Sequence, residues 1–348
     1  MIETNARRFV LYWLGSGCFL IFIMVLVGGI TRLTGSGLSM VDWKLIMGTI
    51  PPLNESEWLT AFEAYKQFPE YDVKHAGFDL SDFKLIFFWE YLHRMIGRLI
   101  GLVFIIPFII LLIRKKIRGV FIWKLLLLFS LGGLQGFFGW YMVKSGLAEI
   151  PHVSHFRLAL HLITAFVTFA LTWWLILSIL FPERVEGTGD NVGFHATVLI
   201  VLTFIQIIYG AFVAGLKAGL FYNTYPKMGD KWIAEGVYAM EPFYRNFIEG
   251  VAGVQFVHRY IAIFLLLYIF YMLFRYMRKA VNLYLGNALI YLAVVGLTQV
   301  LLGIFTLIYG VPLALAVLHQ IGAFLMLMVL IYLLRVSRYA PVKHSISG

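Results

Sequence analysis

Charged residues are scarce in this sequence. Only 13% of its 348 residues are charged, while 61% are hydrophobic; soluble domains carry about 25% charged residues. A chain with so little charge cannot cover a water-exposed surface. The composition therefore excludes an ordinary soluble protein and favours one that folds in a lipid bilayer.

Cysteine is almost absent. Cys18 is the single cysteine, so the chain has no intramolecular disulfide and no Cys-x-x-Cys motif. This excludes redox chemistry by paired thiols within the chain. Any electron transfer therefore has to use a bound cofactor.

Long apolar runs recur along the whole sequence. A helix needs about 20 residues to cross the hydrocarbon core. Two runs, Leu99–Ile113 and Tyr260–Phe274, are shorter and need the polar residues before them to reach full thickness. The other six are Phe9–Ile30, Leu125–Val143, Leu158–Phe181, Thr197–Leu216, Leu285–Tyr309 and Val311–Leu334. We therefore predict an all-α integral membrane protein with eight transmembrane helices.

The basic residues outside these runs predict the topology. They cluster at positions that share one side of the membrane: Arg7, Arg8, Arg114, Lys115, Lys116, Arg118, Lys124, Arg275, Arg278, Lys279, Arg335, Arg338 and Lys343. The positive-inside rule makes this side cytoplasmic, so both termini are expected there. The head Met1–Arg8 is too short for a mitochondrial transit peptide, which favours a bacterial cytoplasmic (inner) membrane. The net charge of +10 follows from this topology and implies no nucleic-acid partner.

The sequence contains an internal repeat. Four pairs of segments match: Glu90–Arg94 with Gln255–Arg259, Gln135–Gly139 with Gln299–Gly303, Leu158–Ala165 with Ala316–Ala323, and Thr34–Leu38 with Leu216–Leu220. Each half then holds four helices in the same orientation. This predicts two four-helix bundles, 1–182 and 183–348, related by a pseudo-twofold axis along the membrane normal.

Each half also contains one long outer loop, Met40–Lys84 and Phe221–Gly250. Their mixed apolar and polar residues fit short helices on the outer membrane interface. Plain connecting loops fit equally well. Within the spans, Gln135 and Gln299 are expected to hydrogen-bond between helices, and glycines such as Gly28 are interpreted as positions of close helix packing.

Four of the nine histidines occupy matched positions in the repeat. His93, His161, His258 and His319 each lie near the outer start of an even-numbered span. Each half thus offers two histidines at similar depth on two helices, the arrangement that clamps a heme between helices with imidazoles as axial ligands. A zinc site would need more ligands nearby, and no repeated methionine or cysteine indicates copper.

The other five histidines have no repeat partners. We expect His75 and His344 to be solvated, and His152 and His155 to lie near the membrane interface. His195 lies near the cytoplasmic start of the fifth span, and the sequence assigns it no role.

Arginines accompany three of the four matched histidines. Arg94 and Arg259 follow His93 and His258 directly, and Arg157 lies one helical turn before His161. A guanidinium near the outer interface is suited to a heme propionate. The alternative for Arg94 and Arg259 is snorkelling to lipid headgroups.

The repeat differs at one position that matters chemically. Glu90 lies three residues before His93, whereas the second half has Gln255 there. A carboxyl group beside a heme can move protons and an amide cannot. We therefore expect Glu90 to be buried and the first half to be catalytic; the alternative is a structural ion pair of Glu90 with Arg94 or Arg98.

Several long motifs resemble those of heme A synthases. In the first half they are Gly28–Met40 followed by Trp43, Glu90–Arg98, Gly133–Gly146 and Arg157–His161. In the second half they are Asn223–Pro226 with Met228, His258-Arg259 and His319-Gln320. The resemblance covers nearly the whole chain. Because this chain has no cysteine pair in its first outer loop, it is similar to the proteobacterial and mitochondrial type of the family.

The resemblance implies a reaction and a different heme for each histidine pair. A ring methyl of heme O, a farnesylated heme, is oxidised by successive hydroxylations to a formyl group, giving heme A for terminal cytochrome oxidase. His258 and His319 would hold a heme b cofactor. His93 and His161 would lie at the substrate heme, with Glu90 as the catalytic glutamate.

Partners and alternatives follow from this interpretation. A membrane farnesyltransferase that produces heme O and an electron donor are expected partners, and a homo-oligomer is compatible with the sequence. The main alternative is a membrane electron-transfer cytochrome with two permanent hemes b; a heme transporter or assembly factor without turnover is another. The difference between Glu90 and Gln255 favours the enzyme over both.

Overall fold

The computed structural model describes residues 2–40, 47–146, 153–184, 191–280 and 283–340. Trp43, His152 and His344 lie outside the described residues. The chain forms two compact units: Phe19–Ala165, and Ile2–Cys18 together with Phe166–Gly348. Each unit is described separately below.

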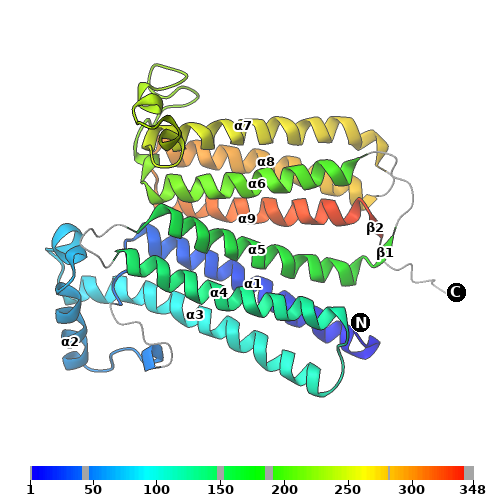
Figure 1. The fold of residues 1–348 in the computed structure, drawn as a ribbon, viewed down its shortest axis with the longest axis horizontal. Helices are drawn as coiled ribbons and strands as arrows, with labels where there is room; N and C mark the ends of the chain where they lie inside the picture. Colours follow the sequence, from blue (N-terminus) through cyan, green and yellow to red (C-terminus); the bar gives the residue numbers. More distant parts are fainter. Residues whose placement is uncertain (1, 41–46, 147–152, 185–190, 281–282, 341–348) are drawn as a thin grey trace. The chain divides into compact units, whose positions relative to one another are not determined.

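Eight long apolar helices dominate the described part of the chain (Figure 1). They are α1 (Arg7–Leu33), α3 (Leu80–Ile113), α4 (Val120–Gly146), α5 (His155–Leu180), α6 (Val192–Gly215), α7 (Val251–Tyr276), α8 (Leu283–Ile308) and α9 (Leu313–Val336). Each is long and apolar enough to cross a membrane, which confirms the eight predicted spans. The protein is thus an all-α, multi-pass membrane protein.

The short elements lie between these helices. They are the 3-10 turns η1 (Thr4–Ala6), η2 (Met47–Thr49), η4 (Ala218–Leu220), η5 (Glu235–Tyr238), η6 (Phe243–Phe247) and η7 (Met277–Lys279), the π turn η3 (Tyr71–His75), and the helix α2 (Glu55–Lys66). Strands β1 (Glu183–Arg184) and β2 (Tyr339–Ala340) pair antiparallel over two residues each, which leaves the fold class unchanged.

The sequence left open whether the two outer loops contain short helices or are plain connections, and the structure shows a different answer for each loop. The first contains the helix α2, whose N-terminus is capped by the side chain of Asn54 accepting from the backbone of Glu57 at 2.9 Å. The second contains the turns η5 and η6 and an isolated β-bridge between Met228 and Lys231. In that loop the buried Asn246 amide donates to the carbonyls of Met240 and Phe243 and holds the turns together.

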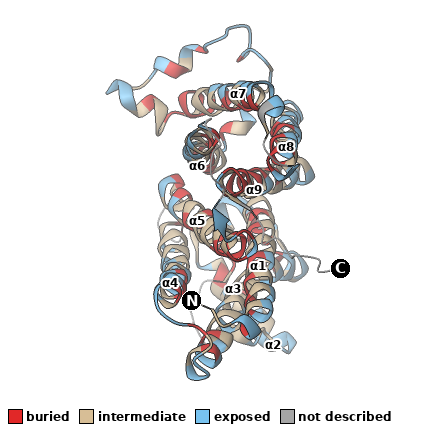
Figure 2. Cartoon of the chain, turned by 90° about the vertical axis from the view of Figure 1, so that its right-hand side faces the viewer, coloured by how far each residue is buried: buried red, intermediate tan, exposed pale blue. Residues whose placement is uncertain are grey.

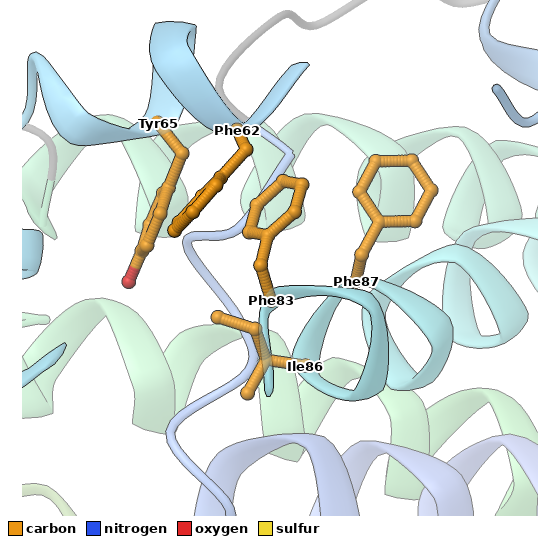
Figure 3. Packing of buried hydrophobic residues seen from close by; sticks show 5 residues of the cluster. All are labelled: Phe62, Tyr65, Phe83, Ile86 and Phe87. Carbon is orange, nitrogen blue, oxygen red and sulfur yellow. The ribbon is translucent and has the colours of Figure 1, made fainter. Parts of the chain in front are cut away.

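An aromatic cluster attaches α2 to the start of α3. Phe62 and Tyr65 of α2 pack against Phe83, Ile86 and Phe87 of α3 (Figure 3). The Phe62 and Phe83 rings stack at 5.0 Å between centroids. Because buried aromatic pairs add about 0.5–1.5 kcal/mol beyond their burial, this cluster fixes the first outer loop on the outer end of α3.

A capping box sets where α3 begins. The Asp79 side chain accepts from the backbone N–H groups of Ser81 and Asp82, and the Asp82 side chain accepts from the backbone of Asp79. The Ser81 hydroxyl, which donates to the same carboxylate at 2.6 Å, and then the two backbone N–H groups lower the pKa of Asp79. With its start fixed, α3 places Glu90 about three turns further along, at 3.6 residues per turn.

Helices α6 to α9 form the bundle of the second unit. Figure 2 shows these four helices nearly end-on around a common centre. Buried residues line the inner sides of α7 and α9, including Leu265, Ile269, Leu327 and Leu330. This packing brings the N-terminal parts of α7 and α9, which carry His258 and His319, together.

Candidate functional site

The second unit brings its predicted histidine pair together. The imidazole rings of His258 on α7 and His319 on α9 have centroids 6.4 Å apart, at an interplanar angle of 83°. Two imidazoles that bind one metal ion from opposite sides, each with a bond of about 2 Å, have centroids roughly 6 Å apart. Nδ1 of His319 lies 3.2 Å from the backbone oxygen of Gln299, which leaves its Nε2 available as a ligand.

The first unit holds the other pair. His93 on α3 and His161 on α5 are close enough to interact electrostatically. Nδ1 of His93, His161 and His258 is buried without a hydrogen-bond partner among the described residues. An unsatisfied buried polar atom costs about 1–3 kcal/mol, so the orphaned nitrogens fit sites that bind a further group. The donor sets of both pairs fit a heme held by two imidazoles.

Glycines on neighbouring helices make room for three of the rings. A Cβ on Gly28 of α1 would lie 2.9 Å from Cε1 of His93, and one on Gly303 of α8 would lie 2.8 Å from Cε1 of His319. On Gly210 of α6 it would lie 3.3 Å from Cε1 of His258. The sequence indicates close helix packing or room for a flat macrocycle at Gly28, and the structure shows that the missing side chain leaves space for the His93 imidazole.

Amide side chains support the histidine helices. Nε2 of Gln135 donates to the backbone oxygen of His161 at 3.1 Å, as predicted for a bond between helices. Nε2 of Gln206 donates to the backbone oxygen of His258 at 2.9 Å. The same amide nitrogen lies 3.4 Å from Nε2 of the His258 ring. Sequence reasoning missed Gln206. Its repeat position in the first half is Met24, so only the second site has this amide.

Glu90 is buried, as predicted, with 3% of its surface exposed. One carboxylate oxygen accepts from Arg94 at 2.6 Å. The other accepts from the Ser39 hydroxyl and from the backbone N–H of Met40, both at 2.8 Å. The ion pair with Arg94 that the sequence left as an alternative is therefore present, and Glu90 also fixes the turn that follows α1.

Gln255 makes the matching contacts in the second unit. Its amide nitrogen donates to the carbonyls of Ala218 at 2.9 Å and Phe221 at 2.6 Å, and its oxygen accepts from Arg259 at 3.1 Å. The two side chains thus attach corresponding turns to corresponding helices. Only Glu90 can also carry a proton.

The arginines contact backbone oxygens. Arg94 donates to the carbonyl of Met40 at 2.9 Å, and Arg259 donates to Tyr222 and, at 2.8 Å, to Thr224. Arg259 is only 7% exposed, so snorkelling to headgroups is wrong for this residue. Its Nε is buried and has no hydrogen-bond partner in the part of the chain that the structure describes.

Arg157 contacts Tyr141 on α4. It donates to the Tyr141 carbonyl at 2.8 Å, and its guanidinium lies 3.8 Å from the centroid of the Tyr141 ring. This contact joins the start of α5 to α4, one helical turn before His161.

The structure corrects the expectation that His75 is solvated. His75 is 8% exposed, and its Nδ1 lies 2.6 Å from the hydroxyl of Tyr65. The aromatic cluster on α3 encloses it, which hydropathy could not indicate. His195 is bonded to the Tyr268 hydroxyl at 2.6 Å, and His155, the first residue of α5, is also buried.

The fold defines a multi-pass membrane protein whose two histidine pairs lie half-buried among helices long and apolar enough to cross a membrane. Residues 11–331 match the family model COX15-CtaA, described as cytochrome oxidase assembly protein. The chain belongs to this family.

Heme A synthases of several bacteria are similar over nearly the whole chain. The heme A synthase of Flavobacterium psychrophilum is 49% identical over 94% of this chain and 98% of its own length. That of Flavobacterium johnsoniae is 48% identical over 94% and 97%, and that of Nitrosospira multiformis is 45% identical over 90% and 89%.

Proposed function

We propose that this protein is a heme A synthase, which oxidises a ring methyl group of heme O to a formyl group and so supplies heme A for cytochrome oxidase. The relationship to proteins of that name over 94% of the chain supports the reaction. The histidine pairs support heme as both cofactor and substrate.

The two pairs take different hemes in this proposal. His258 and His319 hold heme b, and His93 and His161 hold the substrate heme. The centroid separation of 6.4 Å and the bond from Nδ1 of His319 support a permanently ligated site in the second unit. A bound heme supplies an iron centre that accepts and donates electrons.

Glu90 is the proposed proton-transferring group at the substrate heme. The observation that carries this proposal is the difference between two otherwise matching sites: a buried carboxylate at Glu90 against an amide at Gln255. Its bonds to Ser39 and Arg94 orient the carboxylate, and the Ser39 hydroxyl offers a neighbour that can both accept and donate a proton.

Arg94, Arg157 and Arg259 are the proposed partners of heme propionates. Arg259 has a buried Nε with no partner among the described residues, and a carboxylate is the anion that a guanidinium binds best. The remaining donors of Arg259 hold backbone carbonyls, so this side chain would fix the loop and the propionate together.

The setting of the enzyme follows from the sequence. We expect a bacterial inner membrane with both termini in the cytoplasm, two halves related by a pseudo-twofold axis, and the family type without a first-loop cysteine pair. A heme O-producing farnesyltransferase in the membrane and an electron donor are the expected partners, and a homo-oligomer is compatible with the proposal.

Chromatography of extracted hemes tests the proposal. Wild type and Glu90→Gln are made with heme O supplied and purified. Wild type is expected to yield heme b with heme A or its hydroxylated precursor, and the variant to retain heme b but accumulate heme O. If both contain only heme b at two per chain, the electron-transfer cytochrome replaces the synthase.

A further inference from the structure

A glutamine on α6 contacts one histidine of the second unit at two points. Nε2 of Gln206 lies 2.9 Å from the backbone oxygen of His258 and 3.4 Å from Nε2 of the His258 ring. The atom beside a carbonyl oxygen at hydrogen-bond distance has to be the amide nitrogen, because two acceptor oxygens would repel each other. The backbone contact therefore fixes which end of the amide faces the ring.

The orientation of this amide decides which ring nitrogen carries the proton. A neutral imidazole has an N–H at one nitrogen and a lone pair at the other, and an amide nitrogen can only donate. Nε2 of His258 is therefore the nitrogen with the lone pair, and Nδ1 carries the proton. Nδ1 is buried without a hydrogen-bond partner among the described residues, so no described group competes with Gln206 in this choice.

The other histidine of the second unit is held in the same protonation state by a different contact. Nδ1 of His319 lies 3.2 Å from the backbone oxygen of Gln299, which can only accept, so Nδ1 donates and Nε2 keeps the lone pair. The hydrogen bond at one ring nitrogen determines which nitrogen can bind a metal. Both histidines of this pair thus offer Nε2 as the ligand atom.

Helix α6 also restricts where the His258 ring can lie. Gly210 follows Gln206 by four residues, so both face the same side of α6. A Cβ on Gly210 would lie 3.3 Å from Cε1 of the His258 ring, which shows how closely the ring packs against the helix. One helix therefore fixes both the position and the protonation of this imidazole.

The first unit repeats the glycine, as Gly28, but not the amide. Met24 takes the position of Gln206. Its Cε would lie 3.3 Å from a Cβ on Gly97, which is one helical turn after His93, so the side chain at this position reaches α3. A thioether has no N–H and cannot select a tautomer. Nδ1 of His93 is buried and has no hydrogen-bond partner in the part of the chain that the structure describes.

We propose that Gln206 is a positioning residue that fixes His258 with Nε2 as the iron ligand and thereby keeps the heme of the second unit bound. Met24 gives His93 no such support, which allows the heme of the first unit to be exchanged. This role rests on the proposed function, because that function assigns a cofactor heme to one pair and a substrate heme to the other. A cofactor has to stay bound through many turnovers, whereas a substrate has to leave.

Carbon monoxide is the probe that tests this role. An iron held by two imidazoles has no open position, so carbon monoxide binds the reduced heme only after one imidazole leaves. Wild type and Gln206→Met are purified with their hemes and reduced. The rate of carbon monoxide binding to heme b and the heme b content per chain are then measured.

Gln206→Met gives the second unit the residue of the first, which has nearly the same length. Outer partners of a metal-binding histidine contribute about 10–100-fold to metal affinity, so carbon monoxide should bind heme b about tenfold faster or more in this variant. The heme b content after purification should fall for the same reason.

Gln135→Met is the matched control for helix packing. Gln135 also donates its amide to a histidine backbone oxygen, that of His161, at 3.1 Å, but it lies in the first unit. Both variants lose one bond between helices, so both should lower the unfolding temperature to a similar extent. Only Gln206→Met should accelerate carbon monoxide binding to heme b.

Met24→Gln tests the same comparison without weakening the second unit. It supplies an amide beside His93, so it should slow the release of heme A from the first unit and raise the heme A content of the purified protein. Carbon monoxide should also bind this heme more slowly than in wild type. The formyl group of heme A shifts its absorption to longer wavelength, so the two hemes are followed separately.

Three results would overturn this role. One is wild-type carbon monoxide binding and heme b content in Gln206→Met, and another is an equal acceleration in Gln135→Met, which would identify helix packing as the cause. The third is release of heme A from Met24→Gln as readily as from wild type. In each case wild type still converts heme O, so the proposed function stands. If wild type converts none, the proposed function fails, while the heme b measurements still test Gln206.

Discussion

The two histidine pairs share their supporting contacts and differ in the groups beside them. In each unit a glycine leaves space for an imidazole ring. The side chain three residues before the first histidine bonds to a turn, and the arginine directly after that histidine bonds to the same turn. The first unit has Glu90 and Met24; the second has Gln255 and Gln206. The repeat thus gives both histidine pairs the same supporting contacts, while a single side chain, Glu90, leaves only the first pair with a neighbouring group that can carry a proton.

The largest expected effect comes from removing one histidine of either pair, because each pair is proposed to hold a different heme. His258→Ala is expected to abolish heme b binding, because one imidazole cannot replace the pair. His93→Ala should retain heme b and lose the substrate heme. The absorption spectrum and extracted hemes measure both. His195→Ala is the control, since His195 bonds Tyr268 and belongs to neither pair; loss of heme b in this control, or its retention in His258→Ala, contradicts the assignment.

Glu90→Gln gives the first unit the side chain of the second. We expect heme b content at the wild-type level and a loss of heme A formation of about 10²–10⁴-fold, the usual contribution of a general acid–base group. Heme analysis of the purified variant measures this. Conversion at the wild-type rate would show that the carboxylate has only the structural role seen in its contacts with Ser39 and Arg94.

The reverse change should damage the fold. Gln255→Glu replaces an amide that donates to Ala218 and Phe221 with a carboxylate that cannot donate. Two buried carbonyls lose their partner, at about 1–3 kcal/mol each. Thermal unfolding and heme b content should both decrease. A variant as stable as wild type would contradict the view that this position fixes the turn.

Alanine substitutions at Gly303 and Gly210 compare how closely the two histidine rings of the second unit pack against these glycines. Gly303→Ala should disturb His319 more than Gly210→Ala disturbs His258, because the added carbon would lie 2.8 Å from one ring and 3.3 Å from the other. The heme b absorption spectrum reports the displacement. Gly101→Ala is the control: nothing lies within 4 Å of the added carbon, and the helix should gain about 0.5–1 kcal/mol.

The smallest expected effect concerns the start of α3. Asp79 caps α3, whereas α7 begins at Gly250 without a side-chain cap. The pKa of Asp79 is lowered in the folded protein by its hydrogen bonds. Its contribution is therefore present above the pKa of an unfolded aspartate and lost as pH falls through the folded pKa. Asp79→Ala should lower the unfolding temperature slightly at neutral pH and leave it unchanged in strong acid.

The membrane class, the eight spans and the burial of Glu90 could all be predicted from the sequence alone. Hydropathy and length decide whether a helix crosses a bilayer, and both are local properties of the chain. The repeat also placed His258 and His319 near the same end of their helices, which the structure confirms as a pair.

The surroundings of these groups could be read only from the folded structure. Three features depend on contacts between segments that are distant in the sequence. Gly28 leaves space for the His93 ring, Arg259 is buried against loop carbonyls, and His75 lies enclosed beside Tyr65. Spacing along one helix cannot predict such contacts, because they arise where loops of no regular period pack onto helix ends. Burial of a polar side chain is set by its neighbours in space, so packing, and not composition, decided which polar groups became part of the site.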